Sequence, residues 1–142
     1  MKFSRIIMNR MDYLAIRGQR IRMKEGFDSQ NEALLAVLSR PLEEIIPPNE
    51  ELIGLNNGVL GFYAILEVVS IRDISKRVAD LPGSQHTFLC ELSDGSCRLQ
   101  VLEYNHWDFT LTPSCRVLLI PPIRVHRGLY LVNPNNILLL TA

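Results

Sequence analysis

"HTFLCELSDGSCRLQVLEY", residues 86–104, predicts two strands joined by a tight turn. Apolar and polar residues alternate on both sides of the central "SDGS", which is the period of a strand with one buried face. The apolar positions are Phe88, Cys90, Leu92, Cys97, Leu99 and Val101. Asp94-Gly95 tolerates the positive φ angles of a type I′ turn, which would make the two strands a hairpin.

Further strands are predicted on both sides of this hairpin. "VLGFYAILEVVSI", residues 59–71, is rich in β-branched and aromatic residues. "NHWDFTLTPS", residues 105–114, is expected to be a connector with one helical turn. In residues 115–142, Pro121-Pro122 breaks or bulges a strand, Arg127-Gly128 turns a hairpin, and Asn133–Asn136 turns the last segment.

These signals predict five strands within residues 58–142, with a helical connector after the third. A closed five-stranded Greek-key barrel of the oligonucleotide/oligosaccharide-binding (OB) type has this size and order. An SH3-like barrel is the alternative, but its strands are usually shorter and it lacks the connector. The core candidates are Leu66, Phe88, Leu99, Val101, Leu118 and Leu131.

Residues 1–57 are predicted to form a basic arm, a helix and a linker, and thus a short helical extension of a mainly β protein. The arm, residues 1–27, has seven basic and two acidic side chains, a net of 7 − 2 = +5 in a chain of net charge +0. Its pattern fits a weak basic helix or a disordered arm. Ser29 and Glu32 form a capping box for a helix that Pro41 ends, and residues 41–58 read as linker.

The sequence does not predict an enzyme, a cofactor or a metal site. The three cysteines lie inside predicted strands at no metal-binding spacing, which favours buried thiols in a reducing compartment. The three histidines fall in different elements, and no nucleophile motif or phosphate-binding loop is present. No apolar run is long enough to span a bilayer.

The connection between the strands around Val68 and His86 is unusually long. A tight hairpin needs two to five residues, whereas Asp73–Gln85 sets Ile74, Val78 and Leu81 among charged side chains. Isolated apolar anchors on an exposed loop suit a partner's pocket, while the charges keep the free loop in water. The alternative is a solvated connector whose apolar residues fold back on the barrel.

Three stretches resemble a known family: "GFYAILEVVSIRDIS" (61–75), "LCELSDGSCRLQVLEY" (89–104) and "PSCRVLLIPPIRVHRGLYLVNPNNILLL" (113–140). They look like successive strands of the N-terminal OB domain of the RecQ-mediated genome instability protein 1 family. They are less similar to the matching domain of Tudor-domain-containing protein 3. Ser114 and Pro121 depart from the family, which has glycine at both positions, and a helical bundle normally precedes its barrel.

The resemblance implies a non-catalytic scaffold subunit in the nucleus. Members of this family bind a type IA topoisomerase, topoisomerase III, and act with a Bloom-class RecQ helicase and a second small OB-fold protein. Their complex dissolves double Holliday junctions, a step in DNA repair, homologous recombination, meiosis and genome stability. Their loop between the first two strands contacts the topoisomerase; here it corresponds to Asp73, Ile74, Ser75, Lys76, Arg77, Val78, Ala79, Asp80, Leu81 and Pro82.

The alternative function is binding of single-stranded DNA. An OB barrel can stack bases on exposed aromatic rings beside basic side chains. The candidates are Tyr63, Tyr104, Trp107, Phe109 and Tyr130, with Arg98, Arg116, Arg124 and Arg127. Weak contacts with DNA are also expected from the basic arm, at Arg5, Arg10, Arg17, Arg20, Arg22 and Lys24. Aromatic residues make up only 7% of the chain, so protein binding is favoured.

Overall fold

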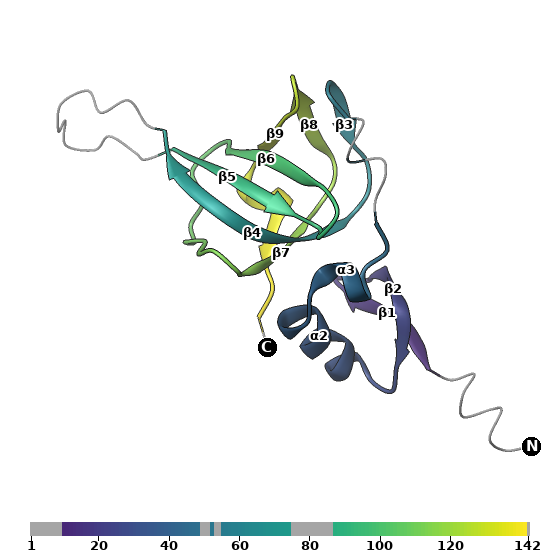
Figure 1. Cartoon of the computed structure of the whole chain (residues 1–142). Helices are drawn as coiled ribbons and strands as arrows, with labels where there is room; N and C mark the ends of the chain where they lie inside the picture. Colours follow the sequence, from purple (N-terminus) through teal and green to yellow (C-terminus); the bar gives the residue numbers. More distant parts are fainter. Residues whose placement is uncertain (1–9, 49–51, 53–54, 75–86, 142) are drawn as a thin grey trace, which may run out of the picture.

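The computed structural model describes residues 10–48, 52, 55–74 and 87–141. The protein is mainly β, with one large sheet curled into a half-barrel and a smaller layer of strands and helices packed below it in the view of Figure 1. The chain builds the smaller layer first, and the C-terminal strand of the barrel runs back toward it.

The large sheet has eight strands in the order β10-β7-β4-β5-β6-β9-β8-β3. The β6–β9 pair is parallel and the other six pairs are antiparallel. The strands are β3 (Gly58–Leu60), β4 (Ala64–Asp73), β5 (Phe88–Ser93), β6 (Arg98–Glu103), β7 (Arg116–Leu119), β8 (Ile123–His126), β9 (Leu129–Val132) and β10 (Ile137–Leu139).

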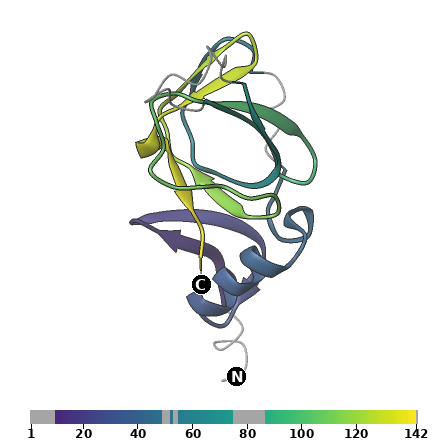
Figure 2. The same ribbon diagram turned by 90° about the vertical axis from the view of Figure 1, so that its left-hand side faces the viewer.

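The sheet curls because β7 and β8 follow each other along the chain but pair at different places in the sheet, and β9 and β10 do the same. β7 pairs with β4, whereas β8, just beyond Pro121-Pro122, pairs with β9. In the same way β9 pairs with β6, whereas β10, just beyond the 3₁₀ turn η1 (Pro134–Asn136), pairs with β7. The Asn136 amide donates to the carbonyls of Ile120 (2.8 Å) and Pro122 (3.1 Å), which fastens the two breaks together. The strands therefore bend round a common interior (Figure 2).

The interior holds the first hydrophobic core, and it confirms Leu66, Leu99 and Val101 as core residues. Phe88 is only partly buried against it. The prediction that Leu131 is a core residue was wrong, because β9 turns Tyr130 and Val132 inward and leaves Leu131 half-buried. Leu118 is fully buried, but it belongs to a second core on the outer side of β7.

The predicted turn at Asp94-Gly95 exists but is not of type I′. That type needs positive φ at both central residues, and only Gly95 has it, at 95°. The Asp94 carboxylate instead accepts the backbone N–H groups of Ser96 (2.8 Å) and Cys97 (2.7 Å). Both Arg127 and Gly128 have positive φ, 51° and 77°, which confirms the turn between β8 and β9.

Residues 11–27 form a β-hairpin, so the expected helix or disordered arm is wrong there. β1 (Met11–Ile16) and β2 (Gln19–Phe27) are joined by Arg17-Gly18, whose φ angles of 50° and 77° repeat the geometry of the later Arg-Gly turn. Leu14 and Met23 are buried while Ala15 and Lys24 are exposed, which is the period of a strand and not of a helix.

The predicted helix is confirmed as α2 (Gln30–Ser39), with the Ser29 hydroxyl accepting the Glu32 N–H at 3.2 Å. The predicted capping box is incomplete, because the Glu32 carboxylate accepts the N–H of Asp28 at 3.2 Å and not that of Ser29. The expected linker contains a further short helix, α3 (Leu42–Ile45). The predicted helical turn in residues 105–114 is wrong, because that connector is irregular. Its shape is set by Trp107, which is drawn into the barrel core.

A second hydrophobic core joins the smaller layer to the barrel. Its buried members are Leu14, Met23, Phe27, Ala33, Ala36, Val37, Leu42, Ile45, Ile46, Ile65, Leu118 and Leu140. Ile65 and Leu118 belong to the outer face of β4 and β7, so β7 and the start of β4 are buried on both faces. This explains why residues 64–66 and 117–119 are apolar without alternation.

Arg116 connects the two layers with hydrogen bonds. It is 8% exposed. Its Nη1 donates to the carbonyls of Val37 and Arg40, both at 2.7 Å, and its Nε donates to Glu67 Oε1 at 3.1 Å. The cation therefore lies at the C-terminal end of α2, where unpaired carbonyls and the helix dipole favour positive charge.

We predict that Arg116→Gln lowers the free energy of unfolding by about 3 kcal/mol, because it removes the charge-assisted hydrogen bonds of a buried guanidinium between α2 and the barrel. Arg98→Gln is the matched control, since it breaks an exposed ion pair with Glu91 (2.9 Å) and should cost less than about 1 kcal/mol. Chemical denaturation of both variants measures the difference. Equal losses would show that Arg116 does not hold the layers together.

Candidate functional site

The end of β4 and the start of β5 extend beyond the barrel as a short two-stranded ribbon, while β5 stays paired with β6 from Leu89 to Ser93. The β4–β7 ladder ends at Glu67, and backbone hydrogen bonds of Val68 with Cys115 and Ser114 continue it by one residue. The pairing of β4 with β5 shifts register between Val68 and Ser70. The β4–β5 ladder then runs out to Asp73 opposite Phe88, and the Ile74 N–H donates to the carbonyl of Thr87 at 2.9 Å. Figure 1 shows this ribbon projecting away from both layers.

The base of the ribbon is fastened to the barrel by Glu103, which is 7% exposed. One carboxylate oxygen accepts the Phe88 N–H at 3.2 Å, and the other accepts the Trp107 N–H at 2.9 Å. The Trp107 indole N–H in turn donates to the carbonyl of Val132 at 2.9 Å. Glu103 was not among the predicted site residues. It continues the inward-facing series of Leu99 and Val101, which is the signal that a carboxylate points into the barrel.

The predicted loop is described only at its root. Asp73 ends β4 and the Ile74 side chain is 43% exposed, while Ser75–Pro82 lie outside the described residues. A shallow pocket of about 360 Å³ lies over β4, β5 and β6 near this root, and its lining includes Arg72, Leu89 and Gln100. The ribbon thus combines a fixed base with an exposed apolar side chain near its tip.

The predicted DNA-contacting residues of the basic arm lie on the β1–β2 hairpin, except Arg5, which is outside the described residues. Arg10 pairs with Asp28 at 3.4 Å, and the Arg20 guanidinium lies 4.6 Å from the centre of the Tyr13 ring. These two side chains are held in place by contacts within the hairpin.

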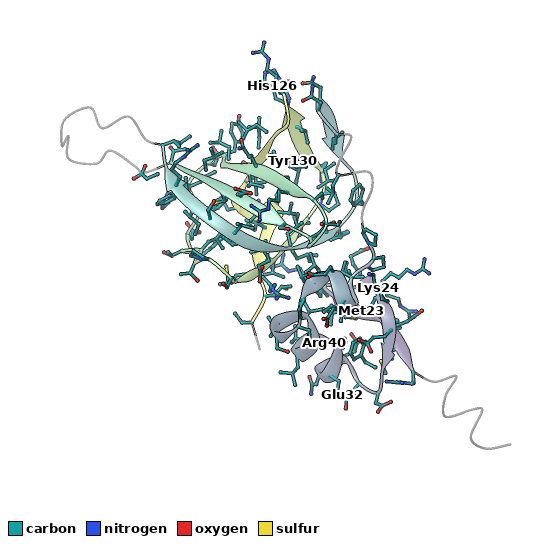
Figure 3. All side chains as sticks on the ribbon, in the orientation of Figure 1. Met23, Lys24, Glu32, Arg40, His126 and Tyr130 are labelled. Atoms are coloured by element: carbon teal, nitrogen blue, oxygen red, sulfur yellow. The ribbon has the colours of Figure 1, made fainter. Side chains whose placement is uncertain are left out.

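The other basic side chains of the hairpin are exposed as well. Arg17 lies in the turn and Arg22 on β2. The Lys24 ammonium donates to the Glu43 carbonyl at 2.6 Å, and Figure 3 shows this side chain on the outer side of the smaller layer. The described basic residues thus cover one exposed face of an ordered hairpin.

The structure brings few of the predicted stacking aromatics to the surface. Trp107 and Tyr130 are core residues with 4% and 1% exposure. The prediction that their rings are available to stack on bases was therefore wrong. Arg116 is buried too. Tyr104 is 50% exposed and lines a groove of about 600 Å³ together with Arg124 and His126. A stacked base would therefore have one exposed ring and one cation in this groove.

The thiols of Cys90 and Cys97 are not poised for nucleophilic chemistry. Burial raises the pKa of Cys90 to about 11, with the nearby Glu103 and Cys115 adding to the rise. Burial and then Asp94, which lies beside the thiol, raise the pKa of Cys97 to about 11. Within the described residues no three His, Cys, Asp or Glu side chains are grouped to hold a metal ion.

No protein-family model and no curated protein matches this chain. In the described part of the chain, no helix is long and apolar enough to cross a membrane. Three surfaces of the protein are candidates for function: the β4–β5 ribbon, the exposed face of the β1–β2 hairpin, and the groove beside Tyr104.

We predict slow alkylation of Cys90 in the folded protein at about pH 8, because a pKa of about 11 instead of 9.0 lowers the thiolate fraction about a hundredfold. Since folding raises this pKa, stability from the neutral thiol is complete below pH 9 and is lost as the pH rises toward 11. Iodoacetamide labelling with peptide mass spectrometry, with and without denaturant, measures the ratio. Equal labelling in both states would contradict the buried position.

Proposed function

We propose that the barrel is a five-stranded Greek-key OB fold. In this assignment the strands are β4, β5, β6, the broken strand β7–β8 and the broken strand β9–β10. The pairing of the first strand with the second and fourth, and the parallel pairing of the third with the fifth, support it. The irregular connector after β6 is the main departure, since Trp107 fills the interior where a helix was expected.

On this fold we propose a non-catalytic scaffold subunit that binds a type IA topoisomerase. The observation that carries the proposal is the position of the long connection, at the tip of a ribbon that leaves the barrel between the first and second strands. The subunit would act in the nucleus with a Bloom-class RecQ helicase and a small OB-fold protein. Its role would be the dissolution of double Holliday junctions during homologous recombination and meiosis.

The physical basis of the proposal is a set of apolar side chains carried on a fixed support. Glu103 fixes the base of the ribbon through the Phe88 N–H, so little conformational freedom is lost there when the tip docks. Ile74 is already exposed at the root, and Val78 and Leu81 add apolar side chains further along the sequence. A few such anchors carry most of the binding energy in protein interfaces.

We predict that replacing Ile74, Val78 and Leu81 together with Ser weakens binding to topoisomerase III more than tenfold, or about 1.4 kcal/mol. Leu35→Ser is the matched control, because Leu35 is a 56% exposed apolar residue on α2, away from the ribbon. Titration calorimetry measures affinity, and thermal melting of the same variants measures stability.

Two outcomes would contradict this use of the loop. Unchanged affinity of the triple variant would place the topoisomerase surface elsewhere. A melting temperature many degrees lower would show that the three side chains pack on the barrel and serve its stability.

The groove beside Tyr104 supports a second candidate function, binding of single-stranded DNA. A base could stack on the Tyr104 ring while Arg124 neutralises a phosphate, since both side chains line the groove. The exposed basic face of the hairpin would add contacts that depend on salt but not on sequence.

We predict that the whole chain binds oligothymidylate only weakly at physiological salt, because few exposed aromatic rings face the groove. Fluorescence anisotropy at several salt concentrations measures the affinity, with Tyr104→Ala and Arg124→Gln as groove variants and Arg22→Gln as the hairpin variant. Binding tighter than about 1 μM that is lost in Tyr104→Ala would make DNA binding the primary function.

A further inference from the structure

The outer edge of β2 presents backbone groups that the hairpin does not use. In a hairpin with a two-residue turn, residue pairs alternate between those that exchange ladder hydrogen bonds and those whose N–H and C=O point away from the partner strand. Counting from the turn, Ala15–Arg20 and Tyr13–Arg22 are pairs of the second kind. Arg20 and Arg22 therefore direct their backbone N–H and C=O groups away from β1.

The opposite edge of the hairpin shows how such groups are satisfied. On β1, the Gln30 side-chain amide donates to the Tyr13 carbonyl at 2.9 Å and accepts the Ala15 N–H at 2.6 Å. One side chain thus makes the two hydrogen bonds that a neighbouring strand would make. Among the described residues, no backbone or side-chain group occupies the outward groups of Arg20 or Arg22 in this way.

A groove of about 500 Å³ lies along this edge, between β2 and the start of β4. Ile21 lines it from the hairpin, and Pro47, Phe62 and Tyr63 line it from the chain that leads into the barrel. Its volume is within the range of known ligand pockets. An extended chain placed against the edge would find apolar surface on the groove side.

Charge selects the kind of chain that fits. Arg20, Arg22 and Lys24 alternate along the exposed face of β2, while Ile21 and Met23 point to the other face. An added strand would set alternate side chains beside the basic residues and the others toward the groove. A segment in which acidic and apolar residues alternate would place its carboxylates beside the basic face of β2 and its apolar side chains in the groove. A second copy of β2 would instead oppose like charges across the edge, as basic residues on edge strands commonly do.

We propose that the outer edge of β2 binds an extended acidic segment of a partner protein by strand addition. The backbone of the segment pairs with Arg20 and Arg22, its carboxylates lie beside their guanidinium groups, and its apolar side chains enter the groove. This surface is separate from the β4–β5 ribbon, so the complex with the topoisomerase and the strand addition are independent of each other.

The test uses the whole chain and a blocked heptapeptide of alternating glutamate and valine. Titration followed by NMR should shift the amide resonances of Arg20 and Arg22, and hydrogen exchange at both amides should slow when the peptide is in excess. The same peptide with N-methyl groups on the backbone nitrogens that face β2 should bind more than tenfold more weakly, because it has lost its donors. A lysine–valine peptide of the same length should bind more weakly still.

Two variants distinguish the contribution of the Arg22 side-chain charge from that of its backbone N–H. Arg22→Gln removes the charge and keeps the N–H, whereas Arg22→Pro also removes the outward N–H, which an edge strand tolerates. Both should weaken peptide binding, Arg22→Pro more strongly, while Arg10→Gln leaves it unchanged. If Arg22→Pro does not fold, as judged by thermal melting, the N-methylated peptide decides the question on the unaltered protein.

Five results would overturn the proposal, and the first four concern the peptide alone. They are no binding at about 1 mM peptide, equal affinity of the N-methylated peptide, equal affinity of the lysine–valine peptide, and resonance shifts confined to the groove beside Tyr104. Displacement of the peptide by oligothymidylate, together with tighter binding of that oligonucleotide, would make this face a nucleic-acid surface and would likewise overturn it.

Discussion

The guanidinium of Arg116 joins three elements that lie far apart in the chain: the C-terminal end of α2, strand β4 and its own strand β7. A buried cation is tolerated only where its hydrogen bonds are met, and here two helix carbonyls and the Glu67 carboxylate meet them. Because these partners fix how α2 lies against the barrel, they also fix the β1–β2 hairpin that packs on α2. The position of the basic face thus follows from a residue of the barrel.

A second constraint, the breaks in the last two strands of the barrel, determines where the ribbon lies. Pro121-Pro122 and η1 let β7–β8 and β9–β10 pair at both ends of the sheet, which curls it. β4 is longer than the strands beside it, so its end, paired with Phe88 at the start of β5, extends past the barrel as the short ribbon. Glu103 accepts backbone N–H groups from the ribbon and from the Trp107 connector, and so keeps the ribbon's base at one place.

The strands of the hairpin of residues 86–104 were predictable because they alternate. Cys90, Leu92, Leu99 and Val101 are all buried as predicted, although the turn between the strands is of another type. The one-residue error at Leu131 has a physical cause: "LYLV" is apolar at every position, so alternation could not choose its inward face. The β1–β2 hairpin was missed because arginines obscured its alternation, although Arg17-Gly18 repeats the Arg127-Gly128 turn.

By itself the sequence determined the β class, the strand breaks, the α2 helix and the long connection after β4, because each depends on the local conformational preferences of nearby residues. Only the tertiary structure decided which side chains reach the surface. Trp107 and Tyr130 have suitable rings for DNA, yet burial in the barrel removes them, while Tyr104 stays exposed. The tertiary structure also turned scattered arginines into one face beside an open strand edge. Such decisions depend on contacts between residues far apart in the chain, which local patterns do not encode.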